Sequence, residues 1–232
     1  MHCRLPRSPA GSIDLLSELT FGSLLVYSPR GSGEVSVRSR GVVRSIKTDG
    51  PAPGGEGMIE YAVRRLAEEL SKCARALSPL FREDLLLVPV PSSAPVLPGG
   101  LWVPKRICEA LVASGFGSRV APILTRTHAI PKSAFAGQGK RPGLGVHEAS
   151  LAVAGRSLFA GEPVLLVDDV VTKGTALLAA ARVVSAARPG SEVSAFALVR
   201  TMGLLPDVER ILDPCLGRIS LTGMPPEAHR EP

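Results

Sequence analysis

The stretch PVLLVDDVVTKGTALLAAAR, residues Pro163–Arg182, decides the fold class of this chain. The apolar run Pro163–Val167 has the length of a buried strand, and the alanine-rich run Gly174–Ala187 predicts a helix. Asp168 and Asp169 stand between them, where the strand is expected to end and a short polar loop to begin. A strand that leads through a short loop into a helix is the building unit of parallel α/β sheets.

The chain around this stretch alternates strands and helices from residue 84 onward. In order, the other expected elements are a strand in 84–93, a helix over Lys105–Ser114, a strand in 119–127, a Gly- and Lys-rich loop over 128–146, a short strand at Leu151–Val153 and a core strand at Val193–Val199. Alternation of this kind predicts a parallel sheet with helices on its faces.

The remaining segments are interpreted from turn residues and periodicity. Two β-rich runs flank Pro29–Gly33, so a β-hairpin is expected within residues 21–48. Apolar residues recur at steps of three and four over Met58–Leu80, which predicts an amphipathic helix. The expected parts are a loosely ordered N-terminus over 1–20, an α/β domain over 21–205, and a C-terminal tail over 206–232 in which RISL, residues 218–221, is an edge strand.

Composition and charge limit the function classes. With 232 residues, 45% hydrophobic and 21% charged, the chain fits one sizeable globular domain, or one domain with an appended lobe. No apolar run reaches membrane-spanning length, and the four cysteines form no C-x-x-C pair, so a protein of the reducing cytoplasm without a zinc ribbon is expected. The net charge of +6 favours anionic partners, whereas an aromatic content of 4% argues against base stacking on nucleic acid.

The two aspartates and the loop after them combine two kinds of binding group. In open α/β sheets ligands bind at the carboxyl ends of the strands, where Asp168 and Asp169 are expected. The loop Thr172–Ala176, TKGTA, supplies hydroxyls and the N–H groups of a helix N-terminus, which together bind a phosphate. Because carboxylates accept hydrogen bonds from sugar hydroxyls or hold a hydrated cation, a sugar phosphate matches both halves. The alternative is that one aspartate is a helix N-cap and the other is solvated.

The stretch resembles the phosphoribosyl pyrophosphate (PRPP) signature of type I phosphoribosyltransferases, in which an apolar strand leads to two acidic residues and a Thr/Gly-rich loop. The resemblance implies an α/β fold with a Rossmann-like parallel sheet flanked by helices, and a small hood that selects the base, here the N-terminal β-hairpin or the tail. It implies that Asp168 and Asp169 bind the ribose hydroxyls, and that the cofactor Mg²⁺ is held mostly by pyrophosphate and touches these aspartates only through ligand or water. The residues implied to cradle the 5′-phosphate are Val171, Thr172, Lys173, Gly174, Thr175 and Ala176.

Two further segments carry the resemblance. VPVPSSAP, residues 88–95, is similar to the family's pyrophosphate loop, which implies that Pro91, Ser92 and Ser93 face the pyrophosphate. The segment 128–146 stands where the family has a flexible catalytic loop. This implies that Lys140 and Arg141 close over the pyrophosphate and join the two aspartates as the catalytic residues.

Within the family, the chain is most similar to ComF-type (competence protein F) proteins. VVRSIKTDG, residues 42–50, and GVHEASLAV, residues 145–153, stand where those proteins have an I-K segment and a later N-V…A-F segment. In departure from that pattern, the cysteine-rich zinc module is absent, Lys173 and Ala176 replace threonines of the phosphate loop, and His147 replaces an asparagine. The lost hydroxyl removes a phosphate hydrogen bond, a loss of about 1–3 kcal/mol, for which Lys173 could compensate as a point charge or Thr175 by a shift of its hydroxyl.

The expected function is transfer of ribose 5-phosphate from PRPP to a nitrogenous acceptor with release of pyrophosphate, with Glu148 or His147 as candidate bases. The alternative is a non-catalytic PRPP- or nucleotide-sensing protein, or a nucleic-acid-associated regulator that uses the basic residues within 38–47. A P-loop or receiver-type protein fits less well, because the spacing of AGQGKRPG and the late position of the acid pair do not match. The expected partners are a small phosphate ligand and, because such folds often dimerise, a second copy; nucleic acid is not favoured and no membrane is expected.

Overall fold

The computed structural model describes residues 16–71, 76–131, 141–154, 161–203, 207–224 and 226–232. Its strands are β1 (Glu18–Tyr27), β2 (Leu86–Pro89), β3 (Arg119–Val120), β4 (Leu124–Arg126), β5 (Leu151–Val153), β6 (Val164–Val171), β7 (Val193–Thr201), β8 (Leu212–Thr222) and β9 (Glu227–Glu231). Seven of them form one sheet in the order β3-β2-β6-β7-β1-β8-β9, and β4 pairs with β5. The first five strands of that order are parallel, while β8 and β9 continue the sheet in antiparallel fashion.

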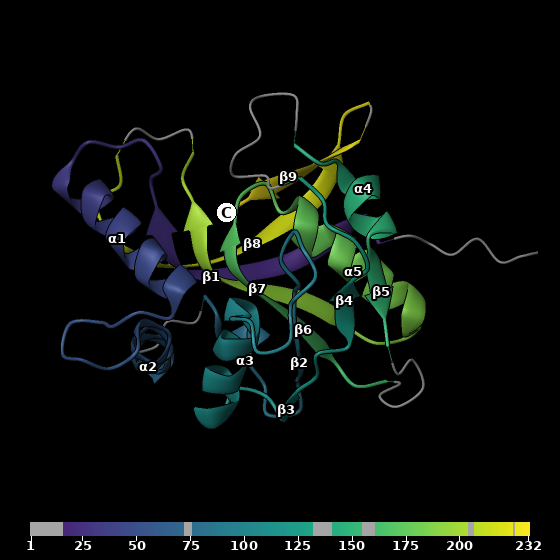
Figure 1. Ribbon diagram of the computed structural model, residues 1–232, viewed down its shortest axis with the longest axis horizontal. Coiled ribbons are helices and arrows are strands. Elements are labelled where there is room, and N and C mark those ends of the chain that lie inside the picture. Colours follow the sequence, from purple (N-terminus) through teal and green to yellow (C-terminus); the bar gives the residue numbers. More distant parts are fainter. Residues whose placement is uncertain (1–15, 72–75, 132–140, 155–160, 204–206, 225) are drawn as a thin grey trace, which may run out of the picture.

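Helices cover both faces of the large sheet (Figure 1). They are α1 (Glu34–Thr48), α2 (Met58–Ser71), α3 (Val103–Ala113), α4 (Leu144–Ala149) and α5 (Thr175–Ala187), with a 3₁₀ turn, η1, at Ser78–Leu80. On one face α1, α2 and α3 bury Ile46, Ile59 and Ile107 in a shared core. On the other face α5 buries Leu178 in a second core, and α4 packs beside α5.

The expected α/β architecture is confirmed. β2, β6 and β7 lie side by side and parallel, with α3 following β2 and α5 connecting β6 to β7. Their apolar runs serve both cores, because Leu165 and Val167 belong to one core and Val164 and Leu166 to the other. Continuous apolar strands are typical of a parallel sheet that is covered on both faces.

The prediction of a β-hairpin within residues 21–48 is wrong, because β1 is an inner strand of the sheet and the chain after it forms α1. The buried residues of α1 are Ser36, Ser39, Val43 and Ile46. The Ser39 hydroxyl donates to the Ser36 carbonyl at 2.7 Å, and the Ser36 hydroxyl accepts a hydrogen bond from the Val208 N–H at 3.0 Å. Because hydrogen-bonded serines occupy half of the buried face, the apolar periodicity of this helix is weak in the sequence.

Both ends of the described chain contribute to the sheet. β1 begins at Glu18, inside the range 1–20 that the sequence predicts to be loosely ordered. RISL lies inside β8, between β1 and β9, so its interpretation as an edge strand is wrong. The polar residues of RISL indicate an edge strand, but β9 pairs with β8 on the side where a free edge was expected.

The helix expected over Met58–Leu80 is observed as α2, which ends at Ser71, and as the η1 turn; residues 72–75 lie outside the described part. Among the residues that the structure describes, no helix is long and apolar enough to cross a membrane.

Candidate functional site

The carboxyl ends of the parallel strands meet along one edge of the sheet, and most of the expected site residues lie there. β2 and β6 are neighbours, and the Val90 N–H donates to the Val167 carbonyl at 2.9 Å where β2 ends. The segment Pro91–Ser93 therefore leaves the sheet next to Asp168. Residues 172–176, which the sequence predicts to bind a phosphate and which we therefore call the phosphate-binding segment, leave the same edge after β6.

The aspartates lie within β6 rather than after it, because the strand continues to Val171 beside β7. The Asp168 carboxylate accepts a hydrogen bond from the Asp169 N–H, and the Asp169 carboxylate accepts one from the Val170 N–H, both at 2.8 Å. The N-cap of α5 is Gly174. The alternative in which one aspartate only caps this helix is therefore wrong.

The electrostatics of the pair are dominated by burial. Burial raises the pKa of Asp168 well above its ordinary value of 3.8, and the neighbouring Asp169 raises it further, while the charge of Lys47 lowers it. The two carboxyl groups therefore resist carrying two negative charges side by side. Such a pair favours hydrogen-bond donors and cations as partners, which fits the hydroxyls of a ribose or a hydrated Mg²⁺.

Lys47, near the end of α1, is the charge partner of the pair. Its Nζ lies 2.7 Å from Oδ2 of Asp169. Burial lowers the pKa of Lys47, but the charge and hydrogen bond of Asp169, together with the charge of Asp168 and a smaller effect of Tyr27, raise the pKa overall. The side chain of Asp169 is 18% exposed and that of Lys47 is 53% exposed, so the lysine reaches the acid pair from the solvent side.

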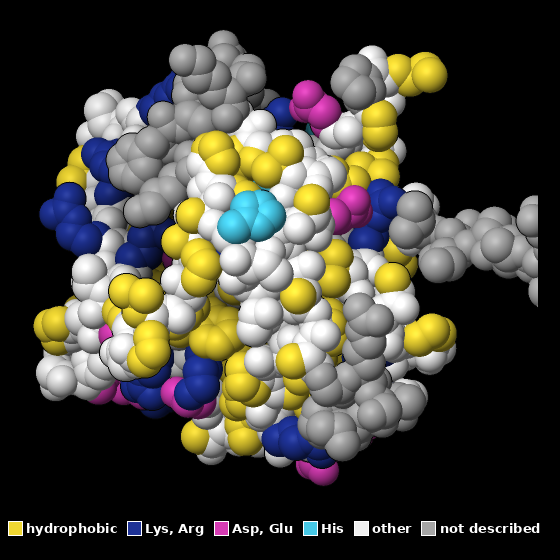
Figure 2. All heavy atoms as spheres, turned by 45° about the vertical axis from the view of Figure 1, so that its right-hand side comes forward, with side chains coloured by type: hydrophobic (Ala, Val, Ile, Leu, Met, Phe, Trp, Pro, Cys, Tyr) yellow, Lys and Arg dark blue, Asp and Glu magenta, His cyan; other side chains and the backbone are white. Residues whose placement is uncertain are grey.

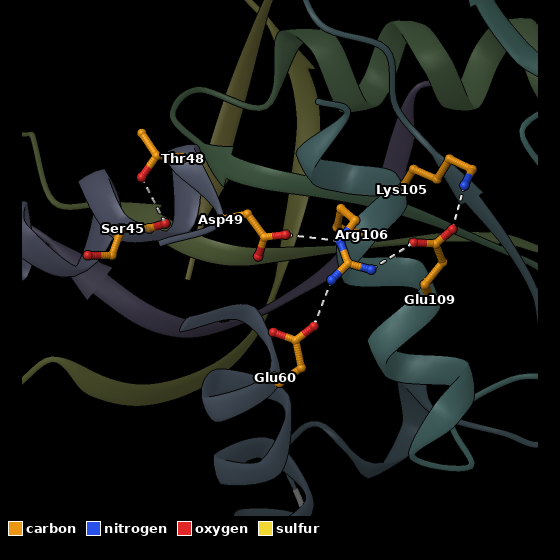
Figure 3. A network of polar contacts seen from close by, with 7 residues as sticks. All are labelled: Ser45, Thr48, Asp49, Glu60, Lys105, Arg106 and Glu109. Carbon is orange, nitrogen blue, oxygen red and sulfur yellow. Dashed lines mark hydrogen bonds and ion pairs between the residues drawn. The ribbon is translucent and has the colours of Figure 1, made fainter. Parts of the chain in front are cut away.

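The end of α1 that carries Lys47 is held by a network of ion pairs (Figure 3). Arg106 of α3 contacts Asp49 at 3.0 Å and Glu60 of α2 at 2.9 Å. Its third partner is Glu109, 3.1 Å away in α3 itself. Asp49 is the C-cap of α1 with a φ of 49°, a left-handed conformation that is uncommon outside glycine. One guanidinium thus joins three helices and holds the chain two residues after Lys47.

The phosphate-binding segment turns sharply into α5 at Gly174. This residue has a φ of 88°, and a Cβ built on it would lie 2.6–2.8 Å from three side-chain atoms of Ile219 in β8, so only glycine fits. The helix that follows is 13 residues long and begins with Thr175 and Ala176, and no side chain caps it. Free N–H groups and the dipole at a helix N-terminus of this kind favour an anionic ligand.

The other residues that are expected to bind the phosphate differ in their exposure and in their partners. Val171 is only 2% exposed, so it offers a ligand almost no accessible surface. Thr172 is exposed at the surface of the turn. Lys173 is also exposed, but its Nζ lies 3.0 Å from Oε2 of Glu227 in β9. The lysine is therefore paired with β9 in this structure.

The segment Pro91–Ser93 is held by a buried arginine, Arg126 of β4, which is 6% exposed. Its partners are the carbonyls of Ser92 (3.0 Å), His147 (3.3 Å) and Pro91 (3.4 Å) and the hydroxyl of Ser150 (2.5 Å). The carbonyl and N–H of a trans peptide point in opposite directions, so the N–H groups of Ser92 and Ser93 point away from Arg126. Burial lowers the pKa of Arg126 and the charge of Asp168 raises it, and a guanidinium stays charged in either case.

The two candidate bases have different surroundings. Glu148 forms an ion pair with Arg182 of α5 at 2.9 Å. His147 is 6% exposed, and its Nδ1 has no hydrogen-bond partner among the described residues. Burial, and then the charge of Arg126, lower the pKa of His147 to about 4. The imidazole is therefore neutral at pH 7.

The protein is expected to lose stability as the pH falls from 6.5 to about 4, because the unfolded chain binds a proton that His147 resists in the folded state. A shift of this size corresponds to as much as about 3 kcal/mol. Urea unfolding at pH 7 and pH 4.5 should show a smaller pH effect in His147→Gln than in the wild type. The control is His229→Gln, at an exposed position of β9. An equal pH effect in all three proteins would contradict the prediction.

The remaining predicted residues are Lys140, Arg141 and the proposed ligands of Mg²⁺. Lys140 lies outside the described part of the chain, so its role stays a prediction. Arg141 is exposed, two residues before the N-cap of α4. The described residues contain no group of three or more His, Cys, Asp and Glu that could hold a metal ion. Asp168 and Asp169 therefore fit Mg²⁺ only as partial or outer ligands, with phosphate oxygens and water completing the shell that this ion requires.

Sequence reasoning did not assign Lys47, Arg126 or Arg230 to the site. Lys47 and Arg126 stand in segments that the resemblance already covers, but their partners are distant in sequence. Arg230 of β9 donates from Nε to the Thr172 carbonyl at 2.8 Å. No pattern near residue 230 indicates this contact.

Comparisons with known proteins give matches only among solved structures: no protein-family model and no curated protein matches the chain. A glutamic acid mutant of an HPRT, altered at an invariant aspartic acid, is 19% identical over 72% of this chain and 74% of its own, with a TM-score of 0.35. Trypanosoma cruzi hypoxanthine phosphoribosyl transferase is 18% identical over 72% of this chain and 71% of its own, with a TM-score of 0.34. At such TM-scores the likeness defines neither the fold nor the family of this chain.

Proposed function

We propose that this protein binds PRPP, or a nucleoside 5′-phosphate, at the carboxyl edge of its parallel sheet, and that it transfers ribose 5-phosphate to a nitrogenous acceptor with release of pyrophosphate. The observation that carries the proposal is the convergence of the acid pair, the uncapped N-terminus of α5 and the segment Pro91–Ser93 at one edge. PRPP has a matching group for each of these: its ribose hydroxyls for the acid pair, its 5′-phosphate for the N-terminus of α5 and its pyrophosphate for the segment Pro91–Ser93. The resemblance to type I phosphoribosyltransferases, and to ComF-type proteins among them, supports the same ligand.

In this proposal Asp168 and Asp169 accept hydrogen bonds from the ribose hydroxyls, and N–H groups of the phosphate-binding segment hold the 5′-phosphate. The N–H groups of Ser92 and Ser93 hold the pyrophosphate, with the charge of Arg126 behind them. The bond from the anomeric carbon to pyrophosphate breaks, and a nitrogen of the acceptor bonds to that carbon. The protein contributes by orienting these groups and by placing carboxylates near the positive charge that develops on the sugar. Mg²⁺, when bound, neutralises charge on the pyrophosphate.

A second candidate is a non-catalytic PRPP- or nucleotide-sensing protein. The ion pair of Lys173 with Glu227 favours it, because the phosphate loop then keeps fewer side-chain donors than the family pattern provides. Pyrophosphate release in the presence of nitrogenous bases distinguishes the two candidates, because a sensor binds PRPP without releasing pyrophosphate. Closure of Lys140 and Arg141 over the pyrophosphate, a cytoplasmic location and a homodimer stay predictions.

A nucleic-acid-associated role is less well supported. Among the basic residues of α1, Arg38 pairs with Glu34, Lys47 with Asp169, and Arg40 donates to the Gly31 carbonyl. On the face shown in Figure 2, Lys and Arg side chains lie in separate groups, some of them beside acidic side chains, rather than in one continuous stripe. Binding of a nucleic-acid backbone favours a connected basic surface.

The proposal is tested by calorimetric titration of PRPP with Mg²⁺ into the wild type and into Asp168→Asn/Asp169→Asn. We expect the double variant to bind at least about tenfold more weakly, because it loses the charged acceptors of the ribose hydroxyls. Unfolding should not explain the loss. The folded state holds the Asp168 proton more tightly than the unfolded chain, so ionisation of Asp168 costs stability as the pH rises above 3.8, and asparagine removes that cost.

The matched control is Asp84→Asn/Glu192→Gln. These carboxylates also lie close together, since both pair with Arg82, but they precede β2 and β7 at the opposite edge of the sheet. This control should bind PRPP like the wild type. Absence of binding to the wild type, or equal binding to all three proteins, would overturn the proposed site. Salt-sensitive DNA binding without PRPP binding would instead favour the regulator.

A further inference from the structure

The hairpin of β8 and β9 lies against the phosphate-binding segment. Ile219 of β8 approaches Gly174 so closely that a Cβ on the glycine would lie 2.6 Å from it. Ile219 is paired in register with Arg230 of β9. Directly opposite residues of an antiparallel pair present their side chains on the same face, so Arg230 also reaches this side of the sheet.

Arg230 connects the hairpin to the ends of two parallel strands. Its Nε donates to the carbonyl of Thr172, and its Nη2 donates to the carbonyl of Thr201, the last residue of β7, both at 2.8 Å. The guanidinium lies over the Phe21 ring, 5.7 Å from its centre. Because the guanidinium is planar and rigid, two donors engaged in this way fix the position of the Thr172 carbonyl relative to β7.

The surroundings of Arg230 show that this placement is costly. Burial, and then the charge of Arg200, lower the pKa of Arg230. Among the described residues, its Nη1 is buried without a hydrogen-bond partner. A charged group held on two backbone carbonyls, with one donor unpaired, does not add much to stability. The effect of Arg230 is therefore on the conformation of the phosphate-binding segment.

That conformation concerns the peptide between Thr172 and Lys173. The carbonyl and the N–H of a trans peptide point in opposite directions. With the Thr172 carbonyl held by Arg230, the Lys173 N–H points away from the Arg230 guanidinium. Without that hold, the peptide is free to rotate and to present its carbonyl, which repels an anion, in place of its N–H.

We propose that Arg230 is a positioning residue of the phosphate site, which holds the Thr172 carbonyl so that the Lys173 N–H remains turned toward the bound phosphate. The inference rests on the proposed function, because it names a residue that shapes the same site. Arg230 acts through the backbone and does not touch the reacting atoms.

The test compares Arg230→Met, which nearly preserves the length of the side chain but removes its donors, with Arg230→Lys, which keeps a charge but not the two-pronged geometry. The matched control is Arg218→Met in β8 of the same hairpin, whose side chain is 60% exposed and pairs with Glu18 at 3.0 Å. All variants lose or alter one cation of the hairpin. Two measurements are made: amide ¹H–¹⁵N NMR spectra without ligand, and calorimetric titration of PRPP with Mg²⁺.

In Arg230→Met the amide signals of Lys173 and Gly174 should shift and broaden while those of β2 stay in place, and the Kd for PRPP should rise about tenfold to a hundredfold. Arg230→Lys should give a smaller rise, and Arg218→Met should match the wild type. Unchanged Lys173 and Gly174 signals in both Arg230 variants would overturn the inference, even if one of them folds poorly. Shifted signals in a protein whose wild type does not bind PRPP would support the hold on the peptide and reject the proposed function instead.

Discussion

Replacing Gly174 by alanine is expected to lower the free energy of unfolding by about 2–4 kcal/mol and to abolish PRPP binding. Two effects add. The φ of 88° strains any residue with a Cβ, and the new methyl group would lie 2.6 Å from Cδ1 of Ile219. Relief of either strain requires the turn to move, and the turn carries the N–H groups proposed to bind phosphate. Urea unfolding and PRPP titration measure the two consequences.

The contribution of the clash can be separated from that of the backbone. Gly190 has a φ of 84° and no atom within 4 Å of its ideal Cβ, so Gly190→Ala tests the backbone strain alone and should cost less than Gly174→Ala. In a double-mutant cycle, Gly174→Ala should also be less destabilising when Ile219→Ala has removed the clashing atoms. Equal destabilisation by alanine at the two glycines would show that the contact with Ile219 does not constrain the turn.

Arg126→Met is the second substitution for which a large effect is expected. It deprives the carbonyls of Pro91, Ser92 and His147 of a charged donor in a buried place. The lost hydrogen bonds and the unpaired carbonyls should lower the free energy of unfolding by about 2–4 kcal/mol. This value already allows for the opposite effect, since the variant no longer has to bury a charged guanidinium. We also expect weaker binding of pyrophosphate alone, because the Ser92 and Ser93 N–H groups lose their fixed direction.

Arg126→Lys separates charge from geometry, because a lysine keeps the charge near Asp168 but cannot reach all of these acceptors. We expect it to bind pyrophosphate more tightly than Arg126→Met while remaining less stable than the wild type. Arg82→Met is the surface control, since the ion-pair partners of Arg82 in the described part of the chain are the exposed carboxylates of Asp84 and Glu192 at the opposite edge of the sheet. If Arg126→Met and Arg82→Met were equally stable, Arg126 would not organise the segment.

The convergence of distant segments explains why sequence reasoning reached only part of the site. Asp168, Gly174 and Ser92 stand in apolar-strand-to-loop patterns that local rules can interpret, and the structure places all three segments at one edge. Lys47 is 122 residues from Asp169, and Arg230 is 58 residues from the Thr172 carbonyl that it holds. Such contacts depend on which strands become neighbours, and no local pattern contains that information.

The sequence by itself determined the parallel α/β unit over Pro163–Arg182, because buried strands and alanine-rich helices have strong local signatures of length, hydrophobicity and turn residues. Tertiary structure alone decided that Glu34–Thr48 is a helix, since its buried serines satisfy their hydroxyls against residues as distant as Val208. It also decided that β8 and β9 extend the sheet beyond β1 and cover the phosphate-binding segment. In both cases the partner is distant in sequence: the Val208 N–H donates to a buried serine of α1, and the backbone of β1 pairs with β8.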